Sequence, residues 1–218
     1  MSKSKSKGNK QNQNSKNAPA PAKKKWLLPT IIVCAVLVLA LGGWCIWKGC
    51  DDAAVENVRY VEITVQDYGT MVAELYPDVA PITVENFLKL TNQGFYDGLT
   101  FHRIISGFMI QGGAPNGNNT VECIKGEFAA NGVQNDLAHT RGVLSMARAN
   151  PYDSASSQFF IVHKDSPHLN GQYAAFGKVI SGIEIVDAIC KDIPVGNNGM
   201  VATANQPVIT SIREIENP

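Results

Sequence analysis

Short apolar segments separated by turn residues fill the chain from about residue 58 onward. In Val58–Gln66, apolar and polar positions alternate, so that Val61, Ile63 and Val65 share one face, as in a half-buried strand. The same criteria predict further strands at Thr70–Tyr76, Phe101–Ile105, Met109–Gln111, Val143–Ala147, Gln158–His163, Phe176–Ile180 and Val208–Ile215. The stretch from Ala114 to Arg141 is rich in Gly and Asn, which predicts mostly irregular structure.

Two segments in this part of the chain have helical spacing instead. One begins near Pro81, carries an apolar stripe of Val84, Phe87 and Leu88, and ends before Gly94. The other is Gly182–Cys190. Many short strands with only two helices indicate a mainly β protein built as a closed antiparallel barrel, and argue against a parallel α/β sheet.

The segment FHRIISGFMIQGG, Phe101 to Gly113, predicts a hairpin whose turn length decides its chemistry. A two-residue turn would set Arg103 opposite Ile110 and point Gln111 to the other face. A three-residue loop, with Gly107 free to take a positive φ, sets Arg103 opposite Gln111 and Ile105 opposite Met109. We favour the three-residue loop, because only that register places the guanidinium and the amide on one face.

A long uncharged run precedes the predicted barrel. Leu27–Trp47 is 21 residues without a charge, enough at roughly 1.5 Å per residue to cross a hydrocarbon core of about 30 Å. Trp26, Trp44 and Trp47 are placed as interfacial anchors. The alternative is a cleaved signal peptide, but the run exceeds the usual apolar region of about 7 to 15 residues and no small-residue cleavage site follows. Residues 26–48 therefore predict a transmembrane signal anchor.

Charge is divided between the two sides of this run. Residues 1–25 hold eight lysines and no acid, whereas residues 49–218 hold 19 Asp and Glu against 10 Lys and Arg. Lysines beside a membrane span predict a cytoplasmic N-terminus and an extracytoplasmic C-terminal domain, so the expected location is the cell membrane with a single pass. We interpret the lysines as a topology signal with attraction to anionic lipid, not as a nucleic-acid site.

Four parts follow from this division. Residues 1–25 have a composition typical of a disordered tail, 26–48 form the anchor, 49–57 form a short linker, and 58–218 form the folded domain. The four histidines show no paired spacing for a metal site, so we expect no metal and no cofactor. Cys50, Cys123 and Cys190 would lie outside the membrane, and their spacing leaves the disulfide state open.

Five ordered segments give the domain a family resemblance. In VENFLKL, FHRIISGFMIQGG, GVLSMARA, SSQFFIVH and LNGQYAAFGKV, the chain resembles the cyclophilin family of peptidyl-prolyl cis–trans isomerases over about Val58 to Glu216. The resemblance implies a closed eight-stranded antiparallel barrel capped by two helices, with the active groove on its outer surface. It also implies a monomer.

The resemblance assigns site residues position by position. The catalytic pair would be Arg103 and Gln111, and the substrate-binding residues would be Phe108, Met109, Ala147, Arg148, Gln158, Phe160, His168, Leu169 and Tyr173. His168 stands where many members have tryptophan, and Tyr173 where many have histidine. These departures resemble shorter bacterial-type members and imply weakened cyclosporin binding. Taken singly, Phe108, Met109 and Phe160 would more often be barrel core, and Arg103 a surface ion-pair partner.

The implied reaction needs no nucleophile. Rotation about an X–Pro bond faces a barrier of about 18 to 20 kcal/mol, largely from amide resonance. A donor that binds the twisted amide more strongly than the planar one lowers that barrier, and arginine keeps its charge and holds its donors rigidly. The expected partners are proline-containing unfolded or nascent exported polypeptides. The alternative is a module at the cell surface that binds proline segments without turnover.

Overall fold

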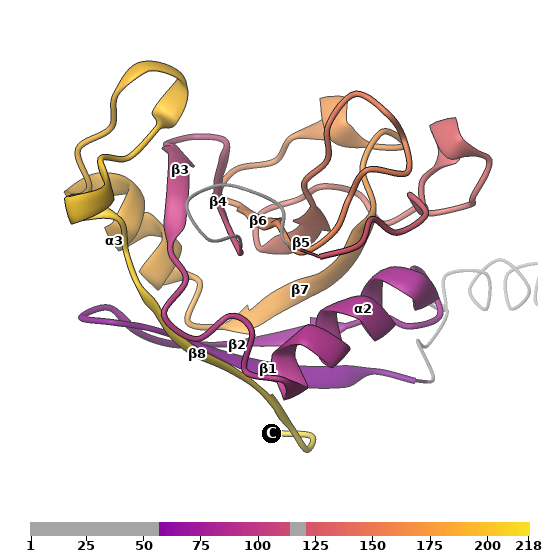
Figure 1. The fold of residues 1–218 in the computed structure, drawn as a ribbon, viewed down its shortest axis with the longest axis horizontal. Coiled ribbons are helices and arrows are strands. Elements are labelled where there is room, and N and C mark those ends of the chain that lie inside the picture. The colour runs from indigo at the N-terminus through magenta and orange to yellow at the C-terminus, as the bar shows by residue number, and fades with distance from the viewer. Residues whose placement is uncertain (1–56, 114–120) are drawn as a thin grey trace, which may run out of the picture. The chain divides into compact units, whose positions relative to one another are not determined.

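The computed structural model describes residues 57–113 and 121–218. Its strands are β1 (Arg59–Val65), β2 (Gly69–Leu75), β3 (Phe101–Ile105), β4 (Met109–Gly112), β5 (Val143–Met146), β6 (Phe159–Val162), β7 (Ala175–Ser181) and β8 (Ile209–Ile215). Its two α-helices are α2 (Pro81–Asn92) and α3 (Glu184–Asp192) (Figure 1). Every predicted strand is confirmed, with ends that differ by at most one residue.

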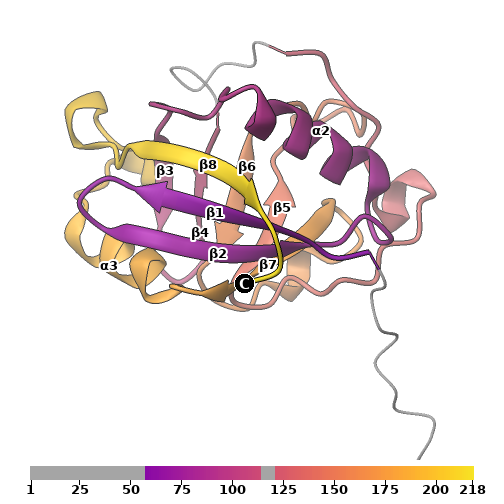
Figure 2. The ribbon, with the colours of Figure 1, turned by 90° about the horizontal axis from the view of Figure 1, so that it is seen from below.

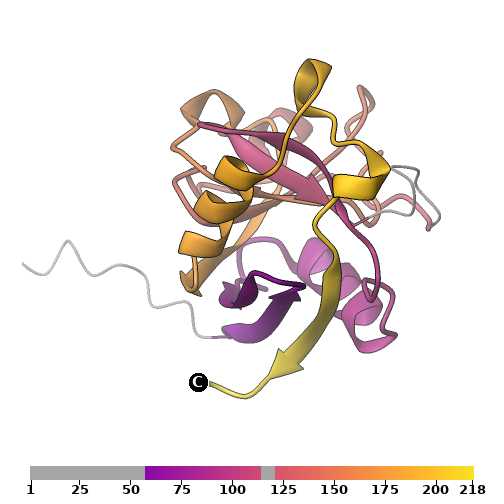
Figure 3. The same ribbon diagram turned by 90° about the vertical axis from the view of Figure 1, so that its left-hand side faces the viewer.

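The strands form one sheet in the order β3-β4-β6-β5-β7-β2-β1-β8, and all neighbours are antiparallel. The prediction of a closed barrel is wrong: the sheet curls into a half-barrel, because its edge strands β3 and β8 do not pair along their lengths. Only the segment just before β3 meets β8, through a Thr100–Val208 bridge and a hydrogen bond from Gly98 N–H to the Ile209 carbonyl (2.8 Å) (Figure 3). Farther along β3, Arg103 instead forms a bridge with Met200, so a loop occupies the place that a closing strand would take.

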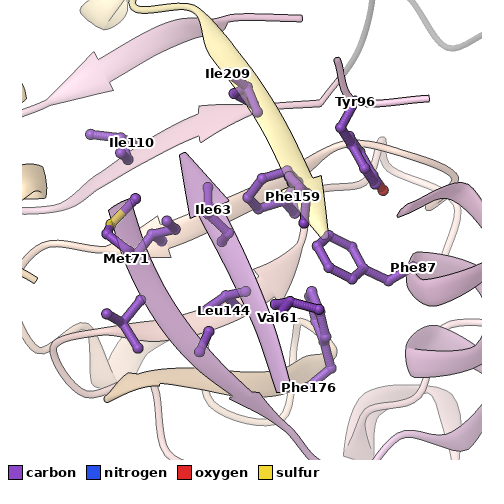
Figure 4. Packing of buried hydrophobic residues seen from close by; sticks show 14 of the residues in the cluster. Val61, Ile63, Met71, Phe87, Tyr96, Ile110, Leu144, Phe159, Phe176 and Ile209 are labelled. Atoms are coloured by element: carbon purple, nitrogen blue, oxygen red, sulfur yellow. The ribbon is translucent and has the colours of Figure 1, made fainter. Parts of the chain in front are cut away.

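The inner face of the sheet holds the main core. The alternating positions Val61, Ile63 and Val65 of β1 are buried, as the sequence pattern predicts. Side chains from distant strands and from α2 meet in this interior: Val61, Ile63, Met71, Phe87, Tyr96, Ile110, Leu144, Phe159, Phe176 and Ile209 (Figure 4). Phe87 brings α2 into the core, with its ring 5.4 Å from that of Phe159 in an edge-on arrangement. The two helices lie at opposite ends of the half-barrel (Figures 1 and 2).

Both helix starts have a local physical cause. The carboxylate of buried Glu127 accepts hydrogen bonds from the N–H groups of Ile82 (3.0 Å) and Thr83 (2.8 Å), which satisfies free donors in the first turn of α2. The second helix was predicted from Gly182 but begins at Glu184. Gly182 has a φ of +80°, and a Cβ there would lie 2.7 Å from the Thr70 carbonyl oxygen, so this residue belongs to the turn that precedes the helix.

The outer face of four neighbouring strands, β4, β6, β5 and β7, is also covered. In β4 and β6, Ile110, Phe159 and Ile161 point into the main core, while Met109 and Phe160 belong to a second apolar cluster on the other side of the sheet. This is why Phe159–Val162 is buried at every position instead of at alternate ones. The second cluster also contains Leu169, and it forms the base of the candidate site.

The predicted membrane anchor and the disulfide state concern residues that lie partly outside the described ranges. The predicted membrane anchor 26–48 lies outside the described residues, and within the described ranges no helix is long and apolar enough to span a bilayer. Contacts divide the chain into Met1–Ala53 and Ala54–Pro218. Cys123 and Cys190 are not bonded to each other, and Cys50 lies outside the described ranges.

Candidate active site

The β3–β4 hairpin has the three-residue loop that the sequence favoured. Arg103 pairs with Gln111 and Ile105 with Met109. Gly107 has a φ of +79°, and the Phe108 N–H donates to the Ile105 carbonyl at 2.9 Å. This geometry matches a turn followed by a left-handed glycine, a common three-residue hairpin. The predicted register is confirmed, so the guanidinium, the amide and the thioether share the outer face of the sheet.

A groove of about 320 Å³ opens over this face. Ten of the eleven predicted site residues line it: Arg103, Phe108, Met109, Gln111, Ala147, Arg148, Phe160, His168, Leu169 and Tyr173. The apolar floor is almost fully covered, since Met109, Phe160 and Leu169 expose only 2%, 5% and 6% of their surface. Phe108 and His168 form part of the lining together, with ring centroids 5.3 Å apart. The structure therefore brings together residues that lie as far apart in sequence as Arg103 and Tyr173.

Arg103 is fixed by hydrogen bonds at two of its nitrogens. Its Nε–H donates to the Asn198 carbonyl at 3.0 Å, and Nη1 donates to Gln111 Oε1 at 3.3 Å. Gln111 Nε2 in turn donates to Gln158 Oε1 at 3.0 Å. Gln158 is thus connected to the site through Gln111 and is not among the side chains that line the groove. Two of the five guanidinium N–H groups are used by these bonds, which leaves donors for a bound peptide.

The sequence did not predict that Asn198 would be a hydrogen-bond partner of Arg103. It belongs to a tight loop in which Asn198 and Gly199 have φ angles of +59° and +75°. A Cβ at Gly199 would collide with the Ile104 carbonyl oxygen, next to Arg103 on β3. The sequence Gly196-Asn-Asn-Gly199 is a recognisable turn signal, but it does not reveal that the turn packs beside β3.

Arg148 lines the groove, and its guanidinium donates hydrogen bonds to backbone carbonyls of the protein itself. It donates to the carbonyls of Gln172 (3.1 and 3.0 Å), Ala149 (2.9 Å) and Asn150 (3.2 Å). Its Cζ also lies 5.1, 5.1 and 4.7 Å from the ring centroids of Phe128, Tyr152 and Tyr173. Arg148 therefore joins loops at one end of the groove, and the adjacent Ala147 contributes the small residue in the lining.

A buried polar group supports the floor from behind. His139 stacks on Phe160 with ring centroids 6.1 Å apart, and its Nε2 lies 2.9 Å from Ser145 Oγ. Its Nδ1 lies 3.1 Å from Asn170 Oδ1. Burial lowers the pKa of His139, so the ring stays neutral near pH 7 and can accept from the serine hydroxyl. His139 and Ser145 are both buried, so this contact holds Phe160 in place and does not present a nucleophile to the groove.

The arrangement suits binding and polarisation rather than bond cleavage. An apolar pocket lies beside a guanidinium whose position is set by a carbonyl and an amide. Among the residues that the structure describes, no group of three or more His, Cys, Asp or Glu side chains could hold a metal ion. Such a site can hold a small apolar ring and direct charged N–H donors at an adjacent amide.

Comparison with known proteins agrees with this geometry. Residues 60–214 match the family model described as cyclophilin type peptidyl-prolyl cis-trans isomerase. The chain belongs to the cyclophilin family. It is 52% identical to peptidyl-prolyl cis-trans isomerase B of Bacillus subtilis over 123 residues, which cover 55% of this chain and 82% of that protein. It is 44% identical to a peptidyl-prolyl cis-trans isomerase of Acinetobacter baylyi over 137 residues, 61% of this chain and 72% of that one.

Solved cyclophilins have the same fold. The crystal structure of a Cryptosporidium parvum cyclophilin type isomerase superposes with a TM-score of 0.65 at 32% identity, covering 74% of this chain and all (100%) of that one. A second structure of that protein, in the presence of the dipeptide Ala-Pro, gives a TM-score of 0.63 at 32% identity and covers 72% of this chain and 99% of that one. The cyclophilin fold predicted from the five sequence segments is therefore confirmed.

Proposed function

We propose that this protein is a peptidyl-prolyl cis–trans isomerase that works in the groove beside Arg103. The observation that carries the proposal is the fixed guanidinium at the edge of an apolar pocket, in a chain of the cyclophilin family. The pocket formed by Phe108, Met109, Phe160 and Leu169 would hold the proline ring. Gln111 and Asn198 would orient Arg103 toward the amide.

The catalytic effect follows from the electronic change during rotation. As the X–Pro bond twists, amide resonance is lost and a lone pair becomes localised on the proline nitrogen. A charged donor held near that nitrogen gains interaction energy in the twisted state that it lacks in the planar state. Because two hydrogen bonds fix the guanidinium in advance, little reorganisation is needed as the lone pair develops. No covalent intermediate is required.

The test is isomerisation of a short X–Pro peptide, measured by NMR exchange without a coupled protease. We expect the wild type to accelerate exchange, and Arg103→Ala to lower kcat/KM by about 100-fold or more, as loss of a preorganised donor does elsewhere. Arg213→Ala is a matched control, because it removes an exposed guanidinium paired with Asp97 away from the groove. Wild-type activity that Arg103→Ala fully retains would contradict the proposed mechanism, and peptide binding without any acceleration would favour a scaffold.

The expected substrates and location extend this proposal. The segregated charge and the uncharged run 27–47 support a membrane-anchored enzyme that acts on exported polypeptides. X–Pro isomerisation in an unassisted chain takes tens to hundreds of seconds, so a catalyst at the exit side of the membrane has a clear use. His168 in the groove lining supports weakened cyclosporin binding, because the family position often holds a larger tryptophan.

A further inference from the structure

The tip of the β3–β4 hairpin is held by a histidine from another part of the chain. His163, just after β6, accepts a hydrogen bond from the Gly107 N–H at its Nδ1, at 2.9 Å. The His163 backbone N–H donates to the Phe108 carbonyl at 2.8 Å. Gly107 and Phe108 are neighbours in the turn that joins the strands carrying Arg103 and Gln111. One residue thus binds the turn through both its side chain and its backbone.

The other side of the His163 ring is bound to α3. Its Nε2 lies 3.0 Å from Asp187 Oδ1. Arg141 binds the same carboxylate with two hydrogen bonds of 2.7 Å and also donates to the His163 carbonyl at 2.9 Å. The imidazole, only 17% exposed, therefore connects a charge pair at α3 with the tip of the hairpin.

These contacts determine which ring nitrogen carries the proton. The hydrogen bonds from Arg141, with smaller contributions from its charge and from His163, hold the pKa of Asp187 below its usual range. Asp187 is therefore ionised near pH 7 and can only accept, so Nε2 must donate to it. In the neutral ring Nδ1 is then unprotonated, which is the form that accepts the Gly107 N–H. The observed bonds require the neutral imidazole.

Protonation of His163 would remove the hydrogen bond between the Gly107 N–H and Nδ1. An imidazolium carries hydrogen on both nitrogens, so Nδ1–H would face the Gly107 N–H, donor against donor. No residue of the turn Ser106–Phe108 is titratable, so the hairpin offers no group that compensates. The charged groups that contact His163 are Asp187 from α3 and Arg141 from the segment before β5. Glu184 and Cys190 of α3 act on Arg141, Asp165 accepts from the Arg141 N–H, and Lys164 follows His163 in the chain. Burial raises the pKa of Cys190 to about 11, so this thiol stays neutral across the acid range.

We propose that His163 is a positioning residue that holds the active hairpin in place only when its ring is neutral, so that isomerase activity falls as His163 takes up a proton. The inference rests on the proposed function for its activity readout. The sign is fixed by the geometry: the Gly107–His163 bond is present at higher pH and is lost as the pH falls. The lost contact lies at the turn next to Phe108, and Arg103 and Met109 lie on the strands that the turn connects.

The test compares kcat/KM from about pH 8 to about pH 5, the interval over which imidazoles change charge. A hydrogen bond is worth about 0.5 to 1.5 kcal/mol, so we expect the wild type to lose roughly two- to tenfold toward acid. In His163→Asn, Oδ1 occupies the place of Nδ1 and accepts without titrating, so its profile should be flat and near the wild-type rate at high pH. His163→Leu has no acceptor and should be slower by a similar factor at every pH.

His168→Asn is the control for the exposed histidine of the domain. Because His168 lines the groove, this variant is judged by the ratio of its rates at high and low pH and not by its basal rate. Burial lowers the pKa of His102 and of His139, so these rings take up a proton at lower pH than a solvent-exposed imidazole does. His168→Asn should keep the acid loss of the wild type. If the loss persists in His163→Asn, or disappears in His168→Asn, the inference is wrong.

A second measurement separates this inference from the proposed activity. Amide hydrogen exchange of Gly107, expressed as a protection factor, reports the bond to His163 whether or not the protein turns over a peptide. We expect protection in the wild type near pH 7, similar protection in His163→Asn, and a loss of about two- to tenfold in His163→Leu. Equal protection in His163→Leu and the wild type would overturn the inference even for a fully active isomerase.

Discussion

At the scale of single residues, Arg148 shows how one side chain can serve a site by holding loops together. Its guanidinium donates to three backbone carbonyls and lies near three aromatic rings, without a carboxylate partner in the described part of the chain. Family resemblance placed Arg148 along the peptide, and it does line the groove. Its contacts with Phe128, Tyr152 and Gln172 could not be predicted, because these residues come from three separate segments whose approach depends on the whole fold.

Arg148→Lys should therefore destabilise the protein although it keeps the charge. An ammonium cannot reproduce the planar fork that reaches the Gln172, Ala149 and Asn150 carbonyls, and its cation–π contacts are weaker, so we expect a loss of about 1 to 2 kcal/mol in the free energy of unfolding. Urea denaturation measures this change. Arg213→Lys, at an exposed pair with Asp97, should stay within about 0.5 kcal/mol of the wild type. Equal stability of the two variants would show that the Arg148 contacts contribute little.

At the scale of elements, the sequence predicted every strand and the hairpin register, because each depends on local periodicity and turn chemistry. The strand ends and Gly107 follow from the alternation of apolar residues and from glycine placement. The second helix was placed two residues too early, because Gly182 was counted as helical although its positive φ puts it in the preceding turn. The loop at Asn198 was missed as part of the site, since nothing local links it to Arg103.

The loop that binds Arg103 can be tested with a pair of glycines. Gly199 and Gly132 both have a φ of +75°, so alanine at either position carries the same backbone strain, about 1 to 2 kcal/mol. A Cβ at Gly132 has no neighbour within 4 Å, whereas one at Gly199 would collide with the Ile104 carbonyl. We expect Gly132→Ala to keep kcat/KM within about twofold, and Gly199→Ala to lower it about tenfold or more by displacing Arg103.

Stability measurements on the same pair provide the check. Gly199→Ala should lose more unfolding free energy than Gly132→Ala, because overpacking adds to the shared backbone strain. Peptide exchange rates should be compared at a temperature where both variants are folded. If both variants lose activity equally, strain alone accounts for the effect and the Asn198 contact does not position Arg103.

At the scale of the whole molecule, the folded domain was predicted from sequence motifs and apolar pattern, whereas the N-terminal parts were predicted from charge and hydropathy. The domain is specified by five ordered segments and by its apolar pattern, and both the family and the fold are confirmed. The tail, the anchor and the linker rest on charge and hydropathy alone, and they stay predictions, as does the location at the membrane. The site needed both sources: the sequence identified the groove residues, while the bonds to Asn198, His139 and His163 depend on contacts between distant segments.

The anchor hypothesis makes a prediction that separates insertion from surface attraction. The eight N-terminal lysines could bind anionic lipid by charge, but salt at about 1 M shortens the screening length to about 3 Å and should release a protein held only in that way. A chain anchored through residues 26–48 stays in the membrane fraction after this wash, because burial of its apolar side chains does not depend on salt screening. Complete release by salt would mean that the anchor hypothesis is wrong.

Removal of the N-terminal parts tests whether the domain needs the anchor for solubility or activity. A chain that begins at Ala54 keeps the unit that contains the groove, so we expect it to be soluble and to match the full chain on a short peptide within about twofold.

Protease added to intact cells should degrade the domain of the full-length protein, because the lysine-rich side of the span is predicted to face the cytoplasm. Full protection of the domain in intact cells, with degradation after lysis, would instead place it on the cytoplasmic side.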